Sequence, residues 1–355
     1  MNVLDLVRPE IRDFAPYSSA RMEAGGGTVL LNANESPWPP PQDGGHDLHR
    51  YPDPQPLALL DALAGVYGVR REQVLAGRGS DEAIDLLTRA FCRAGCDAVL
   101  VATPTFGMYA VSARVQGARV VEVPLDEAFA LDPRALLAAV SPEVKLVYLC
   151  SPNNPSGGLV PIEMIDALTR ALAGRALVVV DEAYGEFAQS ASASTLLQRH
   201  ANLAVLRTLS KAWALAGARV GALLAAPEVI ALLRRIMPPY PLPTPSVRAA
   251  LRALDADGRA LMAKRVAATL AERARVAERL RQTPGVRRVL PSRANFLAFQ
   301  IDSAAAVHAR LTAQGVLLRD IGRYRGLSGF LRLSVGLPQE NDRALELLAP
   351  GGAAA

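Results

Sequence analysis

Lysine is scarce in this chain, which has only Lys145, Lys211 and Lys264 among its 39 Lys and Arg residues. Cysteine and histidine are also few, with three Cys and four His in 355 residues. Neither type forms the paired spacings that hold a metal ion, such as His-Glu-x-x-His, and an odd number of cysteines does not favour a disulfide framework. We therefore expect no metal site, and cysteines that are buried and reduced.

Long apolar runs and clusters of like charge are absent as well. Pro227 and Glu228 interrupt the most apolar stretch, 220–233, so no run is long enough to cross a membrane. The first residues, MNVLDLVRPEIRDF, contain acids where a signal peptide has its apolar core. The net charge of +5 is spread along the chain, without the basic cluster typical of nucleic-acid-binding proteins. These absences predict a cytoplasmic protein that binds neither membrane nor nucleic acid.

The length of the chain and its apolar pattern predict two packed units. Short apolar runs alternate with amphipathic helices, and the runs lie at 97–102, 118–125, 144–150, 176–184, 203–210 and 219–227. Runs this continuously apolar are buried on both faces, as in a mostly parallel sheet that helices cover on either side. We assign residues 49–245 to this large α/β domain.

An arm, a small domain and a tail account for the rest of the chain. Residues 1–48 are rich in Pro and Gly and indicate an irregular arm that packs with the small domain. A helical stretch at 247–283, strand-like runs in 287–301 and 330–336, and a closing helix predict a small α+β domain at 246–350. Residues 351–355 are predicted to form a disordered tail.

Four polar segments stand at places where ligands bind in parallel sheets. Three of them follow apolar runs and one opens a helix: Asn153–Asn154, Asp181 with Tyr184, Ser210–Lys211, and Gly79-Ser80-Asp81. Because ligands bind beyond the carboxyl ends of parallel strands, we expect these segments to converge.

Lys211 is the candidate for covalent catalysis. A Schiff base needs a primary amine that can lose its proton, which arginine does not offer. Lys211 lies between apolar residues in TLSKAWALAG, where loss of water lowers the pKa of an amine. Asp181 follows five apolar residues, and a buried acid suits a protonated pyridine nitrogen as its partner. The alternatives are a surface lysine on a helix and an aspartate that caps a helix or anchors a loop.

An anion site is predicted beside these two residues. Gly79, Ser80 and Asp81 open a helix whose first N–H groups can bind a phosphate, although a plain helix cap fits the local sequence as well. Ser210 and Arg219 add a hydroxyl and a guanidinium. Three more residues suit a pyridine ring with a phenolic oxygen, by stacking or by hydrogen bonds, or serve as ordinary structural residues: Phe106, Asn154 and Tyr184.

The segments SPNNPSG, VVVDEAY and TLSKAWALAGARVG resemble, in order and spacing, the motifs of the fold-type I aminotransferases. The resemblance covers nearly the whole chain and implies pyridoxal phosphate as cofactor, bound as a Schiff base to Lys211. It implies Lys211, Asp181 and Tyr184 as catalytic residues, with Asp181 on the pyridine nitrogen. The further implied contacts are Asn154 and Tyr184 with the phenolate oxygen, and Ser80, Ser210 and Arg219 with the phosphate. It also implies a homodimer with shared active sites, in which Tyr51 reaches the cofactor phosphate of the neighbouring subunit.

Within this family, RPEIRDFAPYSSAR, LNANESP, RYPDPQ, LLRDIG and FLRLSVG are most similar to members that move the amino group of histidinol phosphate to 2-oxoglutarate. That similarity implies imidazole acetol phosphate and glutamate as products. It implies Tyr17, Arg319 and Arg332 as ligands of the substrate's phosphate or carboxylates. Phe106 departs from the Tyr of many members but keeps the aromatic ring. Aromatic amino acid aminotransferases and threonine-phosphate decarboxylases share most of these motifs, and a regulatory binding module of the same fold is the alternative from another class.

Overall fold

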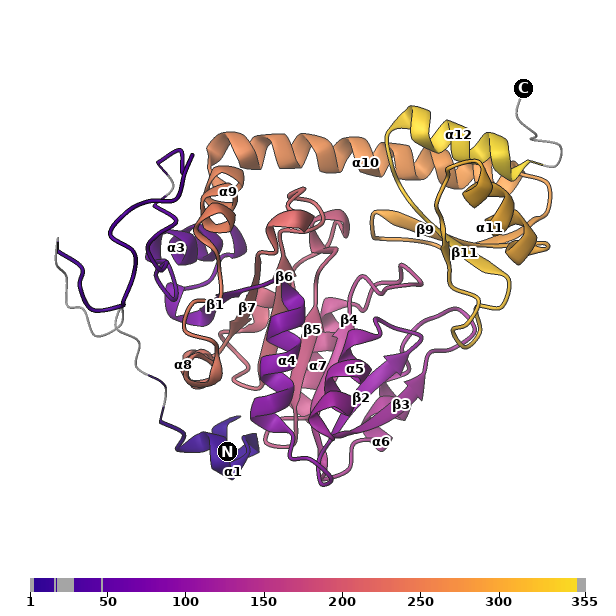
Figure 1. The fold of residues 1–355 in the computed structure, drawn as a ribbon. Coiled ribbons are helices and arrows are strands. Elements are labelled where there is room, and N and C mark those ends of the chain that lie inside the picture. The colour runs from indigo at the N-terminus through magenta and orange to yellow at the C-terminus, as the bar shows by residue number, and fades with distance from the viewer. Residues whose placement is uncertain (1–2, 16, 18–28, 46, 350–355) are drawn as a thin grey trace.

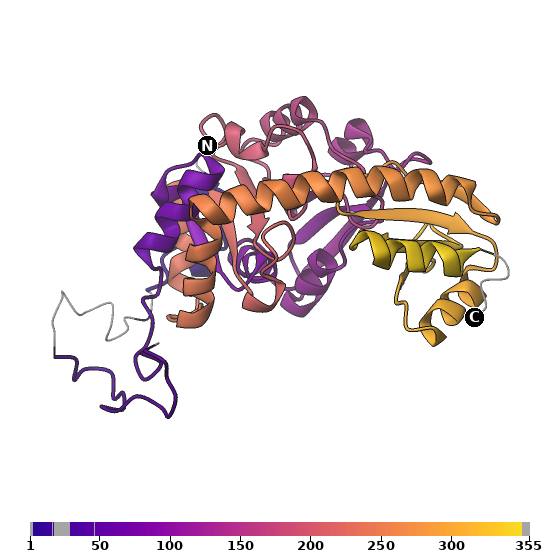
Figure 2. The ribbon, with the colours of Figure 1, turned by 90° about the horizontal axis from the view of Figure 1, so that it is seen from above.

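The structure is a computed structural model that describes residues 3–15, 17, 29–45 and 47–349. The ribbon has a large part and a small part, and one long helix, α10 (Ala256–Gln282), runs along both (Figure 1). Seen from above, this helix passes over the large part and ends beside the small part (Figure 2).

Seven strands form the sheet of the large part. They are β1 (Val74–Gly77), β2 (Ala98–Thr103), β3 (Arg119–Pro124), β4 (Val144–Cys150), β5 (Leu177–Asp181), β6 (Leu203–Thr208) and β7 (Gly221–Ala225). Their order is β1-β7-β6-β5-β4-β2-β3; β7 pairs antiparallel with both β1 and β6, and all other pairs are parallel. The predicted, mostly parallel sheet is confirmed. The sequence did not predict β1, which has only four residues.

Helices cover both faces of this sheet, and alternate residues of each strand therefore enter cores on opposite faces. In β5, Val178 and Val180 join a core with α3, α6 and α7, whereas Leu177 and Val179 join a core with α4, α5 and α8. The helices are α3 (Leu57–Tyr67), α4 (Ser80–Phe91), α5 (Met108–Gln116), α6 (Pro133–Ala138), α7 (Ile162–Ala171) and α8 (Pro227–Ile236), with short turns η2 (Arg71–Gln73), η3 (Gly185–Phe187), η4 (Ala193–Leu196) and η5 (Ala216–Ala218). Over the described ranges, no helix is both long and apolar enough to cross a membrane.

The small part is built on a four-stranded antiparallel sheet in the order β10-β11-β9-β8. Its elements are β8 (Val286–Val289), β9 (Phe296–Ile301), α11 (Ala304–Ala313), β10 (Arg319–Asp320), β11 (Phe330–Ser334) and α12 (Pro338–Leu348). Val276 and Leu280, near the end of α10, share its core. The predicted small α+β unit is therefore confirmed.

The helical segment that connects the two parts contributes side chains to the cores of both. The predicted helix at 247–283 is divided into α9 (Thr244–Leu254) and α10, because the Asp255 carboxylate caps α10 by accepting a hydrogen bond from the Gly258 N–H at 2.8 Å. Val247 of α9 and Val266 of α10 pack against the large core. The domain boundary at 245–246 stays a prediction.

The beginning of the arm packs on the large part. In η1 (Val3–Leu6) and the residues after it, Val3 and Leu6 are buried in the core that contains α4 and α8. The Arg8 N–H donates a hydrogen bond to the Ala90 carbonyl at 3.0 Å, and α1 (Pro9–Arg12) contacts α8. For residues 3–12 this differs from the expected packing with the small domain, since their apolar side chains cover the end of α4 instead. The predicted disordered tail, 351–355, lies outside the described residues.

Candidate active site

A cavity of about 240 Å³ opens beyond the carboxyl ends of β4, β5 and β6. These strands end level with one another, because Cys150 pairs with Asp181, and Asp181 with Leu206, in the parallel ladder. The residues singled out in the sequence that line the cavity are Ser80, Asp81, Phe106, Asn154, Asp181, Tyr184, Ser210, Lys211, Arg219 and Arg332. Segments that are far apart in the sequence thus converge at the place expected for a ligand.

Asp181 is the last residue of β5 and only 2% of it is exposed. Its Oδ2 atom accepts a hydrogen bond from the Tyr109 hydroxyl at 2.7 Å, and its Oδ1 atom accepts one from the Ala183 N–H at 3.0 Å. Burial raises the pKa of the carboxyl group to about 6, against the opposite effect of these two hydrogen bonds. The site therefore holds a buried acid that makes no ion pair with a described side chain.

Lys211 follows β6 and reaches the same cavity. Although the residue is exposed, the surrounding protein lowers the pKa of its amine through loss of water, and the positive charge of Arg332 adds to this effect. Its Nζ atom lies 5.9 Å from the centre of the Tyr184 ring. A lysine with a lowered pKa can act as a nucleophile and as a base.

The start of α4 forms the opposite wall. Gly79 precedes this helix with a φ of +81°, and a Cβ atom there would lie 2.8 Å from Nη2 of Arg219. Gly221 of β7 is just as close, since its Cβ would lie 2.6 Å from the carbonyl carbon of Gly79. The glycines let the turn, Arg219 and β7 approach one another, which leaves the N–H groups at the start of α4 next to a guanidinium.

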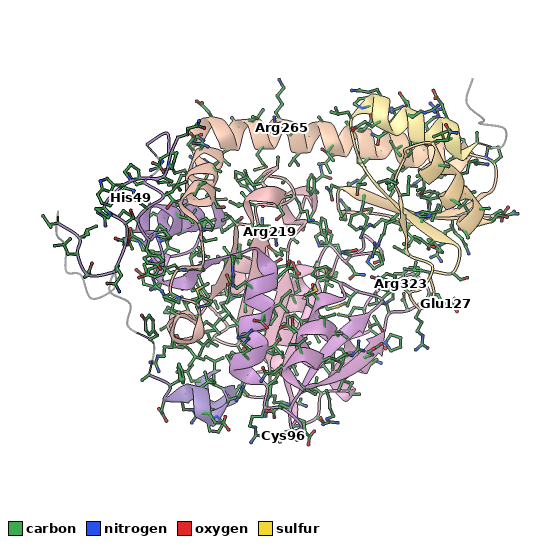
Figure 3. All side chains as sticks on the ribbon, viewed as in Figure 1. His49, Cys96, Glu127, Arg219, Arg265 and Arg323 are labelled. Carbon is green, nitrogen blue, oxygen red and sulfur yellow. The ribbon has the colours of Figure 1, made fainter. Side chains whose placement is uncertain are left out.

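Arg219 and its neighbours give this wall its charge. The guanidinium contacts the Asp81 carboxylate at 3.2 Å and the Ser210 hydroxyl at 3.5 Å. Its side chain lies between the large sheet and α10 (Figure 3). Helix N–H groups, a hydroxyl and a guanidinium together suit a phosphate.

Arg332 reaches the cavity from β11 of the small part. It donates a short hydrogen bond from Nη1 to Oδ1 of Asn154, and its guanidinium lies 5.1 Å from the centre of the Phe296 ring. Its Nε atom is buried and has no hydrogen-bond partner among the described residues. A buried, unpaired N–H next to a cavity is a donor available to an anionic ligand.

Four predicted residues are not among those that line this cavity: Gly79, which directly precedes the lining residue Ser80, and Tyr17, Arg319 and Tyr51. Tyr17 is 70% exposed, and Arg319 is exposed on β10, where it stands directly opposite Arg332 in the strand pair. Tyr51 is 48% exposed and stacks on Tyr240 with ring centres 4.4 Å apart. Within one chain, Arg332 reaches the candidate site, whereas Tyr17 and Tyr51 do not.

A larger cavity, of about 420 Å³, lies beside the end of α7 and the segment before β6. Asp166 lies in its lining and contacts Arg170, Arg199 and His200, at 2.6, 3.3 and 2.6 Å. Because these groups compensate one another, the smaller cavity with its unpaired donors and acids is the better candidate for chemistry.

A model of the aminotransferase class I and II family matches residues 29–348. The chain belongs to this family. It is 53% identical to the histidinol-phosphate aminotransferase of Stenotrophomonas maltophilia, an alignment that covers 100% of this chain and 98% of the relative. It is 52% identical to that of Xylella fastidiosa, over 98% of this chain and 96% of the relative. A solved structure of the Sinorhizobium meliloti enzyme with pyridoxal-5'-phosphate is similar at a TM-score of 0.78 and 29% identity, and the match covers 89% of each chain.

Aminotransferases of this fold use pyridoxal phosphate, and the residues of this aminotransferase fit that cofactor. The buried Asp181 carboxylate makes no ion pair with a described side chain, and a protonated pyridine nitrogen would supply the missing partner. The start of α4 with Arg219 offers donors for the phosphate, and the Lys211 amine is available for the aldehyde. Among the residues that the structure describes, no group of three or more His, Cys, Asp or Glu is placed to hold a metal.

Tyr109 is a neighbour of the site that sequence reasoning missed. It is fully buried at the start of α5, where an apolar pattern predicts core packing. Only the fold shows that its hydroxyl meets Asp181, 72 positions further along the chain.

Proposed function

We propose that this aminotransferase uses pyridoxal phosphate to transfer the amino group of L-histidinol phosphate to 2-oxoglutarate, a step of histidine biosynthesis. The products are imidazole acetol phosphate and glutamate. The observation that carries the proposal is the placement of Lys211, Asp181 and Arg332 around one cavity. Support comes from relatives named histidinol-phosphate aminotransferase, which match this chain at 52 to 53% identity over nearly its full length.

The cofactor is held at both ends in this proposal. Backbone N–H groups of Gly79, Ser80 and Asp81, the Ser210 hydroxyl and the Arg219 guanidinium bind its phosphate. Phe106 stacks on the ring, and Asn154 and Tyr184 donate hydrogen bonds to its phenolate oxygen. Burial raises the pKa of Tyr184, so its hydroxyl stays protonated and remains a donor.

Lys211 and Asp181 carry the chemistry. Bound pyridoxal phosphate supplies an aldehyde for the amine and a ring that withdraws electrons. Asp181 holds a proton on the ring nitrogen, because its carboxylate is buried and stabilises the positive charge there. Lys211, whose amine has a lowered pKa, would remove the proton from the donor carbon that bears the amino group and deliver it to the cofactor carbon that had carried the aldehyde. Arg332 binds the anionic end of each substrate.

The product identifies the reaction. Purified enzyme with pyridoxal phosphate, 2-oxoglutarate and histidinol phosphate should form glutamate, which an enzyme-coupled assay measures. Formation of carbon dioxide from threonine phosphate would favour a decarboxylase. A preference for aromatic amino acids over histidinol phosphate would favour the other aminotransferase branch.

The proposal includes a cytoplasmic homodimer with shared sites. Tyr51 supports it, because its ring is half exposed and stacks on Tyr240 away from its own cavity. In a dimer this tyrosine reaches the cofactor phosphate of the other subunit. Sedimentation of the purified enzyme tests the assembly, and a monomer with full activity contradicts it.

A further inference from the structure

The Tyr109 ring is fixed from two sides below the proposed cofactor site. It stacks on Tyr148 with ring centres 4.5 Å apart and planes at 7°, and it meets Phe106 edge-on at 5.6 Å. Both Tyr109 and Tyr148 are fully buried. The ring therefore has no room to turn, and its hydroxyl points at Oδ2 of Asp181 at 2.7 Å.

This hydroxyl is a permanent donor. Burial and the negative charge of Asp181 raise the pKa of Tyr109 well above its ordinary value, so it keeps its proton at every working pH. The Ala183 N–H holds the other oxygen of Asp181 at 3.0 Å. With one donor on each oxygen, the carboxylate has a fixed plane and a stabilised negative charge.

We propose that Tyr109 is a positioning residue: it keeps the Asp181 carboxylate ionised and oriented, and so controls how firmly the bound cofactor keeps the proton on its ring nitrogen. This inference rests on the proposed function, because it needs pyridoxal phosphate in the cavity. Tyr109 does not line the cavity itself, and the lining residues that it contacts are Phe106, Cys150 and Asp181.

Other titratable groups also influence the charge of Asp181, so an experiment on Tyr109 needs a control for their effects. They are Asp81 of α4, Tyr148 and Cys150 of β4, the neighbouring Glu182, Tyr184, and Lys211 after β6. Of these six, Tyr148 offers a matched control. Its hydroxyl is equally buried but lies 3.4 Å from Thr88 Oγ1 and 3.5 Å from the Ile84 carbonyl, and makes no hydrogen bond to Asp181.

The test is a pH titration of the visible absorption band of the holoenzyme, for wild type, Tyr109→Phe and Tyr148→Phe. A cofactor whose ring nitrogen has lost its proton withdraws electrons less strongly, which makes the titrating group of the cofactor more basic. The midpoint of the titration should therefore move to higher pH in Tyr109→Phe. A hydrogen bond to a charged group changes an equilibrium constant about tenfold, which corresponds to about one pH unit. Tyr148→Phe should keep the wild-type midpoint. A Tyr109→His variant, which retains a ring N–H donor, should return the midpoint toward wild type.

A cofactor analogue with carbon in place of the ring nitrogen separates positioning from packing. With it, wild type and Tyr109→Phe should titrate alike, because Asp181 then has no ring proton to hold. The inference is overturned if Tyr109→Phe keeps the wild-type midpoint, if Tyr148→Phe shifts equally, or if the shift persists with the analogue. A wild-type protein that shows no visible band with pyridoxal phosphate overturns the proposed function itself, and the inference with it.

Discussion

Lys211 differs from the other two lysines in its surroundings. The Lys145 amine donates a hydrogen bond to the Pro142 carbonyl at 2.8 Å, and Lys264 is exposed on α10, whereas Lys211 faces the cavity with a lowered pKa. Only an amine with an appreciable neutral fraction bonds readily to an aldehyde.

Borohydride reduction of the holoenzyme should therefore fix the pyridoxyl group to Lys211, and peptide mapping by mass spectrometry should find it there. Lys264→Arg should label like wild type, and Lys211→Arg should not label, because arginine keeps its proton. A label on Lys145 or Lys264 contradicts the assignment.

The raised pKa of Asp181 should make the stability of the apoprotein depend on pH. Its pKa of about 6 lies above the value of about 3.9 for an unfolded chain, so the folded protein binds the extra proton between these values. Its stabilising contribution is complete below the lower value and is lost as the pH rises through about 6. Relative to Asp181→Asn, apo wild type should lose free energy of unfolding on the order of 3 kcal/mol over this range. Urea unfolding at several pH values measures it, and parallel curves for the two proteins contradict it.

The sequence predicts site residues that directly follow a strand. It does not predict a site residue whose hydrogen-bond partner lies on an element far away in the chain. Lys211 and Asp181 are visible in the sequence because a polar residue directly follows an apolar run. Tyr109 carries no such signal, since a buried tyrosine on a helix fits core packing equally well. Its role depends on the order of β2, β4 and β5 in the sheet, which the local sequence does not specify.

At the scale of elements, a buried ionic network ties the turn after β5 to the loop after β6. Arg207 of β6 contacts Glu182 at 2.6 Å and Glu186 at 2.7 Å, and its guanidinium lies 4.6 Å from the centre of the Tyr67 ring. The Trp213 indole N–H also donates to Glu186, at 3.0 Å. Because Trp213 stands two residues after Lys211, this network holds together the segments that carry the two central residues of the site.

Arg207→Met should destabilise the apoprotein strongly, since it leaves Glu182 and Glu186 buried without a cation. Loss of one partner of a buried pair costs about 3 to 5 kcal/mol. Arg71→Met is the control, because it breaks an ion pair with Asp61 on the surface, and it should change stability far less. Urea unfolding measures both, and equal small losses would show that the buried network adds no stability.

At the scale of the whole molecule, an aromatic contact joins the small part to the large part. Phe129, with a left-handed φ of 60°, meets Phe330 edge-on at 6.4 Å. Arg288 lies 5.6 Å from the centre of the Phe129 ring and donates to the Glu127 carbonyl at 3.1 Å. Glu127 lies where the two parts meet (Figure 3). The apolar pattern predicts two units, but it does not predict their docking, which depends on side chains in a turn after β3.

This docking brings Arg332 over the cavity. Its neighbour in β10, Arg319, stands opposite it, and residues directly opposite in an antiparallel pair point to the same face of the sheet. Both guanidiniums therefore belong to the face on which Arg332 meets Asn154. Only Arg332 reaches the cavity within a single chain, and Tyr17 and Tyr51 lie outside it. The sequence alone does not tell which of these four residues reach the cavity within one chain, because all four occur in similar family motifs.

Arg332→Ala tests whether the natural amino donor carries a phosphate. A phosphate group needs a cation to bind it, and an unphosphorylated donor does not. Histidinol phosphate should be a far better amino donor than histidinol for wild type. Loss of one charge-assisted contact costs about 1.5 to 3 kcal/mol, so kcat/KM for histidinol phosphate should fall about 10- to 100-fold, with a much smaller change for histidinol. Arg323→Ala removes a guanidinium that stacks on Tyr324, away from the cavity lining, and should keep the wild-type preference. Steady-state kinetics with both donors decide the matter. Equal use of the two donors by wild type, or an equal loss for both in Arg332→Ala, contradicts the phosphate site and favours an aromatic amino acid aminotransferase.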